Sequence, residues 1–323
     1  MLGLVLLTAL LLTQFISRAH TDLLTEARRS QLEPLRDEAY TVLQVSLAVL
    51  RDCAAVDEGL HAPAQGWGDP LTYSGYIPPP EYTVRVEILD ESGKLPLAAR
   101  SAAALLGLLR ELNVSATDTD RFVDALLAWT EAEAAARTID GLVAATDGTP
   151  ALAAPQAALR SFEELRFIPA TRAVLCDEQG DWNETGRAFL ANVTLHPLGA
   201  INVNTASDVL LTALGLNPTA VNPARQNRPG SPESVLRSMD GIGPAADAGI
   251  TVGTDATVLR IRITATQGAR RFTLEVVAQP GGDTALAPVP TDLAAGESEP
   301  RPWTRNSIDS GFRILEVQEN NGY

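Results

Sequence analysis

Residues 83–89 read TVRVEIL, and the alternation of polar and apolar side chains in this stretch predicts a half-buried β-strand. The strand runs into Asp90-Glu91-Ser92-Gly93, whose residue types predict a turn. Because a single strand is not stable alone in water, TVRVEIL must pair with strands elsewhere in the chain. The position of those partner strands decides the fold.

The partner strands are predicted near the C-terminus. Residues 258–264 (VLRIRIT) and 272–278 (FTLEVVA) alternate in the same way, and Gln267-Gly268-Ala269 joins them as a β-hairpin. A segment rich in glycine, proline and alanine follows, and 311–317 is a last candidate strand. The first strand and the hairpin therefore belong to one small sheet, and the residues between them form an insertion.

The insertion is mainly helical in pattern. Helical periodicity covers 99–112 and 118–137, and shorter helices are predicted at 205–214 and 232–239. In SFEELRF, Ser161 is followed three residues later by a glutamate, which is the capping-box signature of a helix N-terminus. Residues 201–204 are predicted to be short and extended.

A long helix is predicted before the first strand. Apolar residues recur at helical spacing from 21 to 50, and Pro34 predicts a kink or a local break near 30–34. Residues 61–80 are rich in glycine, proline and aromatic residues, so we expect a surface loop without regular structure. The predicted fold class is α+β, with a long N-terminal helix packed on a small antiparallel sheet and a large helical domain inserted in that sheet.

The first residues of the chain carry the longest apolar run. Residues 1–17 (MLGLVLLTALLLTQFIS) have no charged side chain, and this length is at the lower limit for a helix that crosses a bilayer. A secretory signal peptide would require a basic residue before its apolar region, but no basic residue precedes Arg18. A membrane helix is the favoured interpretation, and a signal peptide cleaved after Ser17-Arg18-Ala19 is the alternative.

The composition argues against several functions. The chain has 323 residues, a net charge of −15 and a pI near 4.6, so its surface repels nucleic-acid phosphates and anionic lipids. Lys94 is the only lysine in the sequence, and therefore a P-loop or Schiff-base lysine would have to be this residue.

Motifs of common enzymes are missing from the sequence, and we expect a protein without enzymatic activity. The chain has no HExxH, GxSxG, GxxxxGK or GxGxxG pattern, and His20, His61 and His196 lie far apart. Each histidine is predicted to be a loop or surface residue. The two cysteines, Cys53 and Cys176, permit one disulfide in an oxidising compartment or two separate buried thiols.

Three polar groups are candidate sites. The first surrounds Trp129 and offers carboxylates for a Ca²⁺ ion, or alternatively a solvated helix face: Asp118, Asp120, Asp124, Glu131 and Glu133. The second is Asp90 and Glu91 beside Lys94, most simply a turn with a local ion pair. The third is INVNTAS (201–207), whose side chains are expected to cap the following helix.

The segment 201–243 resembles a helix-hairpin-helix unit. INVNTAS, a leucine-rich helix and a second helix ending in Asp240-Gly241-Ile242-Gly243 occur in that order. In DNA-binding versions of this unit, backbone amides at the turns hold phosphates. Here Leu214-Gly215-Leu216 occupies the first turn, and the nearby cations are Arg225, Arg228 and Arg237. A secreted or membrane-anchored DNA-binding protein is therefore an alternative that the net charge opposes.

Most of the chain resembles the minor pseudopilin K family of type II secretion systems. Five landmarks occur in the order of the family: an apolar N-terminus with Gly3 at the cleavage position, DESGKL (90–95), Trp129-x-Glu131-x-Glu133, FEELRFIP (162–169) and INVNTAS. No single motif is decisive, but five in order are specific. The family leader carries basic residues, whereas only Met1 and Leu2 precede Gly3 here, so we expect most of the leader to be missing.

The resemblance implies a structural role at the tip of the pseudopilus, in support of protein secretion. It implies a pilin-like core, an inner-membrane helix and a periplasmic C-terminal domain in a Gram-negative cell envelope. The domains would be a pilin N-terminal segment at 1–20, core at 21–97 and 251–323, and an inserted helical domain at 98–250. The implied partners are the minor pseudopilins I and J, the pseudopilus, prepilin peptidase and the inner membrane, with no nucleic acid.

The resemblance also assigns roles to residues. Prepilin peptidase would cut after Gly3 and leave Leu4 as the first residue of an assembly helix formed by Leu4, Leu6, Leu7, Thr8, Leu10 and Leu11. Most pilin-type subunits have a glutamate at the fifth mature position, where this chain has Thr8, and that difference favours a cap. Some family members bind calcium near the tryptophan, which would assign Glu131 and Glu133 as ligands.

Overall fold

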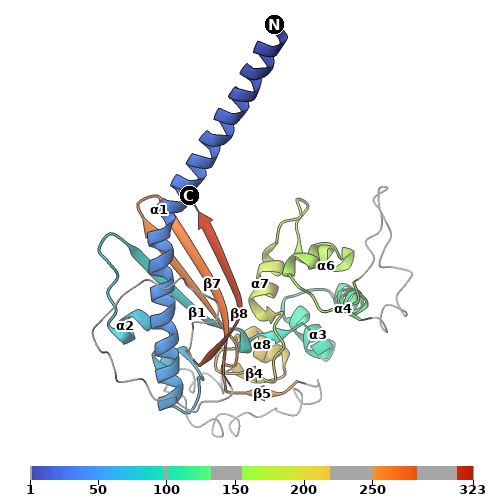
Figure 1. Ribbon diagram of the computed structural model, residues 1–323. Helices are drawn as coiled ribbons and strands as arrows, with labels where there is room; N and C mark the ends of the chain where they lie inside the picture. Colours follow the sequence, from blue (N-terminus) through green and yellow to red (C-terminus); the bar gives the residue numbers. More distant parts are fainter. Residues whose placement is uncertain (1, 98–100, 132–154, 219–249, 282–310, 323) are drawn as a thin grey trace. The chain divides into compact units, whose positions relative to one another are not determined.

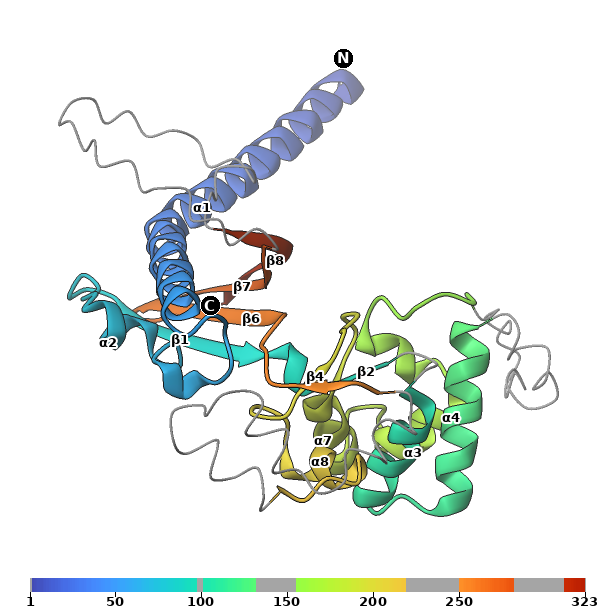
Figure 2. The same ribbon diagram turned by 90° about the horizontal axis from the view of Figure 1, so that it is seen from below.

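The helix α1 (Leu2–Val56) has 55 residues and runs through Pro34 (Figure 1). The predicted local break therefore does not occur. Figures 1 and 2 both show α1 changing direction partway along its length, which is the effect of a proline inside a helix. The computed structural model describes residues 2–97, 101–131, 155–218, 250–281 and 311–322.

The chain divides into two compact units. Unit 1 comprises Met1–Arg51, Asp69–Ile88 and Ile261–Tyr323, and unit 2 comprises Asp52–Gly68 and Leu89–Arg260. Most of unit 2 is thus inserted in the sequence of unit 1.

Unit 1 contains most of a four-stranded sheet in the order β1-β6-β7-β8. Its strands are β1 (Thr83–Asp90), β6 (Leu259–Gln267), β7 (Arg270–Pro280) and β8 (Phe312–Gly322). The last two pair in antiparallel fashion, with a bulge between Val277 and Ala278. The predicted first strand, hairpin and last strand are confirmed, and β1 lies beside β6 as the pairing argument required.

The core of unit 1 forms between α1 and one face of the sheet (Figure 2). Alternate residues of β6 and β7 are buried, which is the period of a strand with one covered face. The buried residues of α1 recur at helical spacing, and they include Leu35, Ala39, Val42, Leu43, Leu47 and Leu50. Helix and sheet therefore each contribute one apolar face.

One stretch among the described residues, Leu32–Val56, is long and apolar enough to cross a membrane. Its most apolar window is 44% buried inside the protein, and buried core helices meet the same criterion. Because this stretch lines the core of unit 1, we assign it to the core. The side chains of residues 1–13 lie outside the described part, so the membrane helix at 1–17 stays a prediction.

Unit 2 is mainly helical. Its longer helices surround one apolar core, and they are α3 (Ala102–Glu111), α4 (Ala116–Thr130), α6 (Pro169–Leu175), α7 (Glu184–Asn192) and α8 (Asp208–Ala213). Two short parallel pairs complete it: β2 (Leu95–Pro96) with β3 (Val193–Thr194), and β4 (Ile201–Asn202) with β5 (Val252–Gly253). The predicted capping box forms at Ser161, where it begins the 3₁₀ helix η4 (Phe162–Arg166).

Some predictions about elements were wrong. The segment 61–80 contains the 3₁₀ helix η1 (Pro63–Gln65) and the helix α2 (Pro70–Ser74). Proline at a first helical position starts a helix rather than breaking one, and Asp69 caps α2. The helix predicted for 118–137 ends at Thr130, and α6 and α7 were not predicted. The helix predicted at 232–239 lies outside the described residues.

Candidate functional site

The turn that follows β1 is a buried polar element of unit 2. Asp90 caps the 3₁₀ helix η2 (Glu91–Gly93), and Glu91 is only 1% exposed. The predicted ion pair is confirmed, because Lys94 Nζ lies 2.9 Å from Glu91 Oε1. Arg260 Nε lies 2.7 Å from the same oxygen, and the sequence pattern did not reveal this second cation. Burial alone would raise the pKa of Glu91, but Lys94 and Arg260 outweigh it and lower that pKa.

Asp90 joins this turn to the INVNTAS segment. Its Oδ2 accepts hydrogen bonds from Asn202 Nδ2 at 2.7 Å and from Thr205 Oγ1 at 2.6 Å, and its Oδ1 accepts one from Ser92 N at 2.8 Å. Burial raises the pKa of Asp90, and the three donors offset only part of that effect. Two of the five sequence landmarks therefore meet at one carboxylate.

Gly93 lets the two segments approach closely. A Cβ atom on Gly93 would lie 2.8 Å from the carbonyl carbon of Thr205 and 2.9 Å from the amide nitrogen of Ala206. Both neighbours are backbone atoms, which have little room to move. The glycine of DESGKL is therefore required by packing against residues 205–206.

Ser92 connects the same turn to the start of β6. Its Oγ accepts hydrogen bonds from the amides of Thr257 and Val258 at 2.7 and 2.9 Å. The amide of Glu91 in turn donates to the carbonyl of Val258 at 2.9 Å. The chain segments that enter and leave unit 2 are thus bonded to each other.

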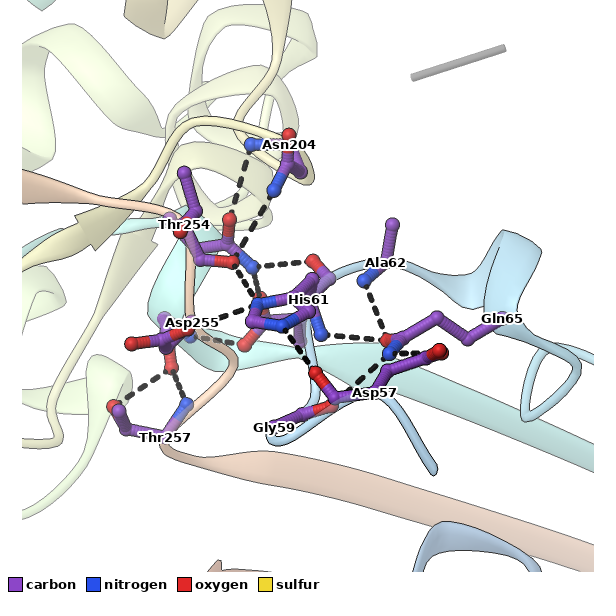
Figure 3. Close-up of polar contacts among 12 residues, drawn as sticks. Asp57, Gly59, His61, Ala62, Gln65, Asn204, Thr254, Asp255 and Thr257 are labelled. Carbon is purple, nitrogen blue, oxygen red and sulfur yellow. Dashed lines mark hydrogen bonds and ion pairs between the residues drawn. The ribbon is translucent and has the colours of Figure 1, made fainter. Parts of the chain in front are cut away.

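His61 belongs to a second polar group, shown in Figure 3, and of the two predicted alternatives, a loop or a surface residue, the structure has the first. It lies in a loop but is only 6% exposed. Its Nδ1 lies 2.9 Å from Asp255 Oδ1 and 3.2 Å from the carbonyl oxygen of Thr254, and its Nε2 lies 3.3 Å from the carbonyl oxygen of Asp57. Thr254 is 193 residues away in the sequence, so no local pattern could place it beside His61.

Gln65, which is labelled in Figure 3, and Asn202 hold the loop of His61 in place. Gln65 Oε1 accepts hydrogen bonds from the amides of His61 and Ala62 at 2.6 and 3.1 Å, and Gln65 Nε2 donates to Asp57 Oδ2 at 2.8 Å. Asn202 Nδ2 donates to the carbonyl of His61 at 2.8 Å as well as to Asp90. One amide side chain therefore links both polar groups.

The polar residues of INVNTAS divide their roles. Ser207 caps α8 through the amide of Leu210 at 3.0 Å, as predicted. Asn202 and Thr205 bind Asp90 instead, and Asn204 Nδ2 donates to the carbonyl of Thr254 at 3.2 Å. Only part of the capping prediction is thus confirmed. The segment mainly connects the turn after β1 with the chain that leads into β6.

Another pair of landmarks meets at Glu164. Trp129 is 7% exposed, and its Nε1 donates to Glu164 Oε2 at 3.3 Å. The other carboxylate oxygen accepts from the amides of Arg160 and Ser161 at 2.7 and 3.3 Å. The tryptophan of the acidic segment and the capping glutamate of FEELRFIP therefore form one structural contact.

The predicted acidic residues near Trp129 lie partly on α4 and partly beyond its end. Asp118, Asp120 and Asp124 are exposed on α4, which agrees with the solvated-face alternative. Glu131 directly follows α4, and Glu133 lies outside the described residues. Within the described part, no group of three or more histidine, cysteine, aspartate and glutamate side chains is placed to hold a metal. Calcium at Glu131 and Glu133 stays a prediction.

Cys53 and Cys176 are both buried and are not joined to each other. The Sγ atom of Cys53 lies 3.7 Å from the carbonyl oxygen of Gln65. Burial raises the pKa of the Cys176 thiol, and the nearby Arg166 and Arg172 lower it in part. The structure thus has the second of the two predicted alternatives, separate buried thiols.

The backbone amides at the first turn of the helix-hairpin-helix-like segment are hydrogen-bonded within the protein. The amides of Leu214, Gly215 and Leu216 donate to carbonyls of α8 at 2.9–3.1 Å, so none of the three points free toward a phosphate. Unit 2 contains 24 acidic and 13 basic residues, a net charge of −11, which also opposes DNA binding. The second helix and its turn lie outside the described residues.

The comparison with known proteins is informative at the level of the fold. No family model and no curated protein matches the sequence. Among solved structures, the fold is similar to a chain of the GspK-GspI-GspJ complex from the enterotoxigenic Escherichia coli type 2 secretion system, with a TM-score of 0.60. The match covers 90% of this chain and 98% of that chain, at 17% sequence identity. The chain has a pilin-like α+β fold.

This result confirms the predicted fold class, with its long helix, small antiparallel sheet and further helices. In a pilin-like fold the sheet and helix form the core, and here most of the helical unit 2 lies between β1 and β6 in the sequence. The buried polar groups of Asp90 and His61 lie where unit 2 begins and ends. Their hydrogen bonds hold chain segments together, so we assign them a structural role.

Proposed function

We propose that this protein is a minor pseudopilin of the K type, a non-enzymatic subunit of a type II secretion pseudopilus. The observation that carries the proposal is the extent of the fold match, which covers 90% of this chain and 98% of the other. Unit 1 alone is too short to supply that coverage. The helical insertion therefore matches together with the sheet and the long helix.

The N-terminal part of α1 would assemble with neighbouring subunits. α1 is continuous from Leu2 to Val56, so the apolar run at its start and the core helix form one element. Cleavage after Gly3 by prepilin peptidase would make Leu4 the first residue, and Leu4–Leu11 would lie first in the inner membrane and then among the helices of the pseudopilus. The remainder of the protein would lie in the periplasm.

The partners would be the minor pseudopilins I and J. The structural neighbour comes from a complex that contains GspI and GspJ, which supports partners of the same kind for this chain. The tip position rests on two arguments. Thr8 cannot supply the charge that a glutamate would offer to the N-terminal amine of an adjacent subunit. The inserted unit 2 also adds bulk that a copy stacked on this subunit would have to accommodate.

The test is to express the full chain with prepilin peptidase and with the minor pseudopilins I and J of the same secretion system. We expect a mature N-terminus at methylated Leu4 by mass spectrometry, and a complex of the three proteins by size-exclusion chromatography with light scattering. A mature end near His20 would instead identify a cleaved signal peptide. That result, or the absence of a complex, would overturn the proposal.

A further inference from the structure

Exposed apolar side chains gather in one short segment of unit 1, Tyr73–Pro80. Ile77 is 87% exposed, the highest value of any large apolar side chain in the described part of the chain, and Tyr73 is 49% exposed. Pro80 is exposed as well. Single apolar residues on a surface are common, so exposure alone does not identify a binding element.

The chain before Ile77 is held in a fixed conformation. α2 ends at Ser74, and the next residue, Gly75, has the left-handed conformation of a helix C-cap, with a φ of 67°. The amide of Tyr76 donates to the carbonyl of Leu71 at 3.0 Å, and its hydroxyl donates to Glu38 Oε1 on α1 at 3.0 Å. Tyr76 is therefore tied both to α2 and to the core helix.

The chain after Ile77 is restricted by three consecutive prolines, Pro78, Pro79 and Pro80. Each proline fixes its own φ angle and confines the residue before it to extended or polyproline conformations. A turn then follows, in which the amide of Tyr82 donates to the carbonyl of Pro79 at 2.9 Å, and β1 begins at Thr83. Ile77 is thus presented to solvent from a backbone that is constrained on both sides.

This arrangement is typical of a binding element. An apolar side chain in water gives no stability to the free protein, whereas a segment that is already ordered loses little entropy when it binds. Extended proline-rich segments are recognised by grooves lined with aromatic and apolar side chains. The exposed carboxylates of Asp69 and Glu81 flank the segment, so a groove with a basic rim fits it better than an anionic lipid surface.

We propose that Tyr73–Pro80 is a docking element that inserts Ile77 into an apolar, basic-rimmed groove of a partner pilin-type subunit. The inference rests on the proposed function and adds the surface of unit 1 that meets the partner. Because the segment leads into β1, one of the two outer strands of the sheet, the partner would also lie beside that strand.

The experiment measures binding of the full chain to minor pseudopilin I and to minor pseudopilin J, each separately purified. Ile77→Ser is expected to raise the Kd for one of them about tenfold, equivalent to about 1.4 kcal/mol, without changing the melting temperature. Replacing the three prolines by serine retains Ile77 but frees the backbone, and should weaken the same complex. The matched control is Phe167→Ser, which removes an apolar side chain that is 60% exposed in unit 2.

Each outcome bears on the proposal. Unchanged affinity of Ile77→Ser, or an equal loss in Phe167→Ser, would overturn it while leaving the proposed function intact. A change in self-association of Ile77→Ser in place of partner binding would identify a second copy as the occupant and would also overturn it. If the unaltered chain binds neither subunit, the proposed function fails, and the docking element fails with it.

Discussion

At the scale of single residues, the buried polar groups of unit 2 depend on close contacts that a change of one residue would disturb. Asp90 receives three hydrogen bonds, Glu91 contacts two cations, and Gly93 has backbone atoms where a Cβ would lie. The sequence predicted the turn and the Glu91–Lys94 pair because both are local. It did not predict Asn202, Thr205 or Arg260 as partners, because these residues are distant in the chain.

Gly93→Ala tests the close approach of the turn to residues 205–206. The added methyl would meet the backbone of Thr205 and Ala206, and we expect a loss of about 2 kcal/mol in unfolding free energy, as in other overpacked sites. Urea unfolding followed by circular dichroism measures it. Gly199→Ala is the matched control, because a Cβ at that position would have open space around it to 4 Å. Equal stability of the two variants would contradict the packing argument.

Glu91→Gln tests the buried ion pairs. Lys94 and Arg260 would lose their shared carboxylate, and we expect a cost of about 3 kcal/mol at neutral pH. Because the pKa of Glu91 is lowered in the native state, its stabilising effect is present above its ordinary pKa of 4.5 and is lost as the pH falls through the lower native value. Asp90 has a raised pKa and acts in the opposite direction.

The measurement for Glu91→Gln is the melting temperature of variant and unaltered protein between neutral and acidic pH. Their difference should be largest at neutral pH and should shrink below the ordinary glutamate pKa. Glu163→Gln is the control, since Glu163 is 58% exposed in its pair with Arg166 and should change stability by less than about 1 kcal/mol. A difference that stays constant with pH would count against the ionised pair.

At the scale of elements, the strands were predicted more accurately than the short helices. TVRVEIL and the hairpin carry a period of two over many residues, and this pattern can be recognised without knowledge of their partners. α2, α6 and η1 each begin with proline at a first helical position, where proline promotes the helix that it would otherwise break. The sequence signal of proline is therefore ambiguous until its position is known.

Side-chain hydrogen bonds connect α1 with β8, and their effect can be tested. Glu319 accepts hydrogen bonds from Arg36 at 2.9 Å and from Tyr40 at 2.7 Å. Burial, followed by the bond to Glu319, raises the pKa of Tyr40 to about 12. Since the native pKa is raised, this tyrosine stabilises the fold below pH 10, and that effect is lost as the pH rises toward 12.

Glu319→Gln should lower the pKa of Tyr40 toward 10, because the negative charge that opposes phenolate formation is removed. The loss of stability should be only about 0.5–1 kcal/mol, since Arg36 and Glu319 are 43% and 32% exposed. Ultraviolet titration of the phenolate measures the pKa, and Tyr40→Phe assigns the signal. Glu316→Gln on the same strand should leave the titration unchanged, and a shift of equal size there would contradict the assignment.

At the scale of the whole molecule, the order of elements was predictable although most contacts were not. The first strand has no partner nearby in the sequence, so it must pair with the hairpin near the C-terminus. That pairing makes the residues between the strand and the hairpin an insertion in the sequence of unit 1. The five landmarks were found in order along the chain. The sequence did not show that DESGKL contacts INVNTAS at Asp90, or that Trp129 contacts FEELRFIP at Glu164.

The net charge gives a prediction for the whole chain that separates the proposed function from the helix-hairpin-helix alternative. Phosphate binding releases counterions and needs clustered cations, whereas unit 2 carries a net charge of −11 and the amides of Leu214, Gly215 and Leu216 already donate to α8. We therefore expect no gel shift of duplex DNA at low salt, even at micromolar protein.

Two outcomes would contradict this expectation. A shift that weakens as salt rises and disappears when Arg225, Arg228 and Arg237 are replaced by alanine would support the DNA-binding alternative. Those arginines are the cations nearest the hairpin in the sequence. A shift that survives this replacement would point to contacts elsewhere on the chain and would equally contradict the expected result.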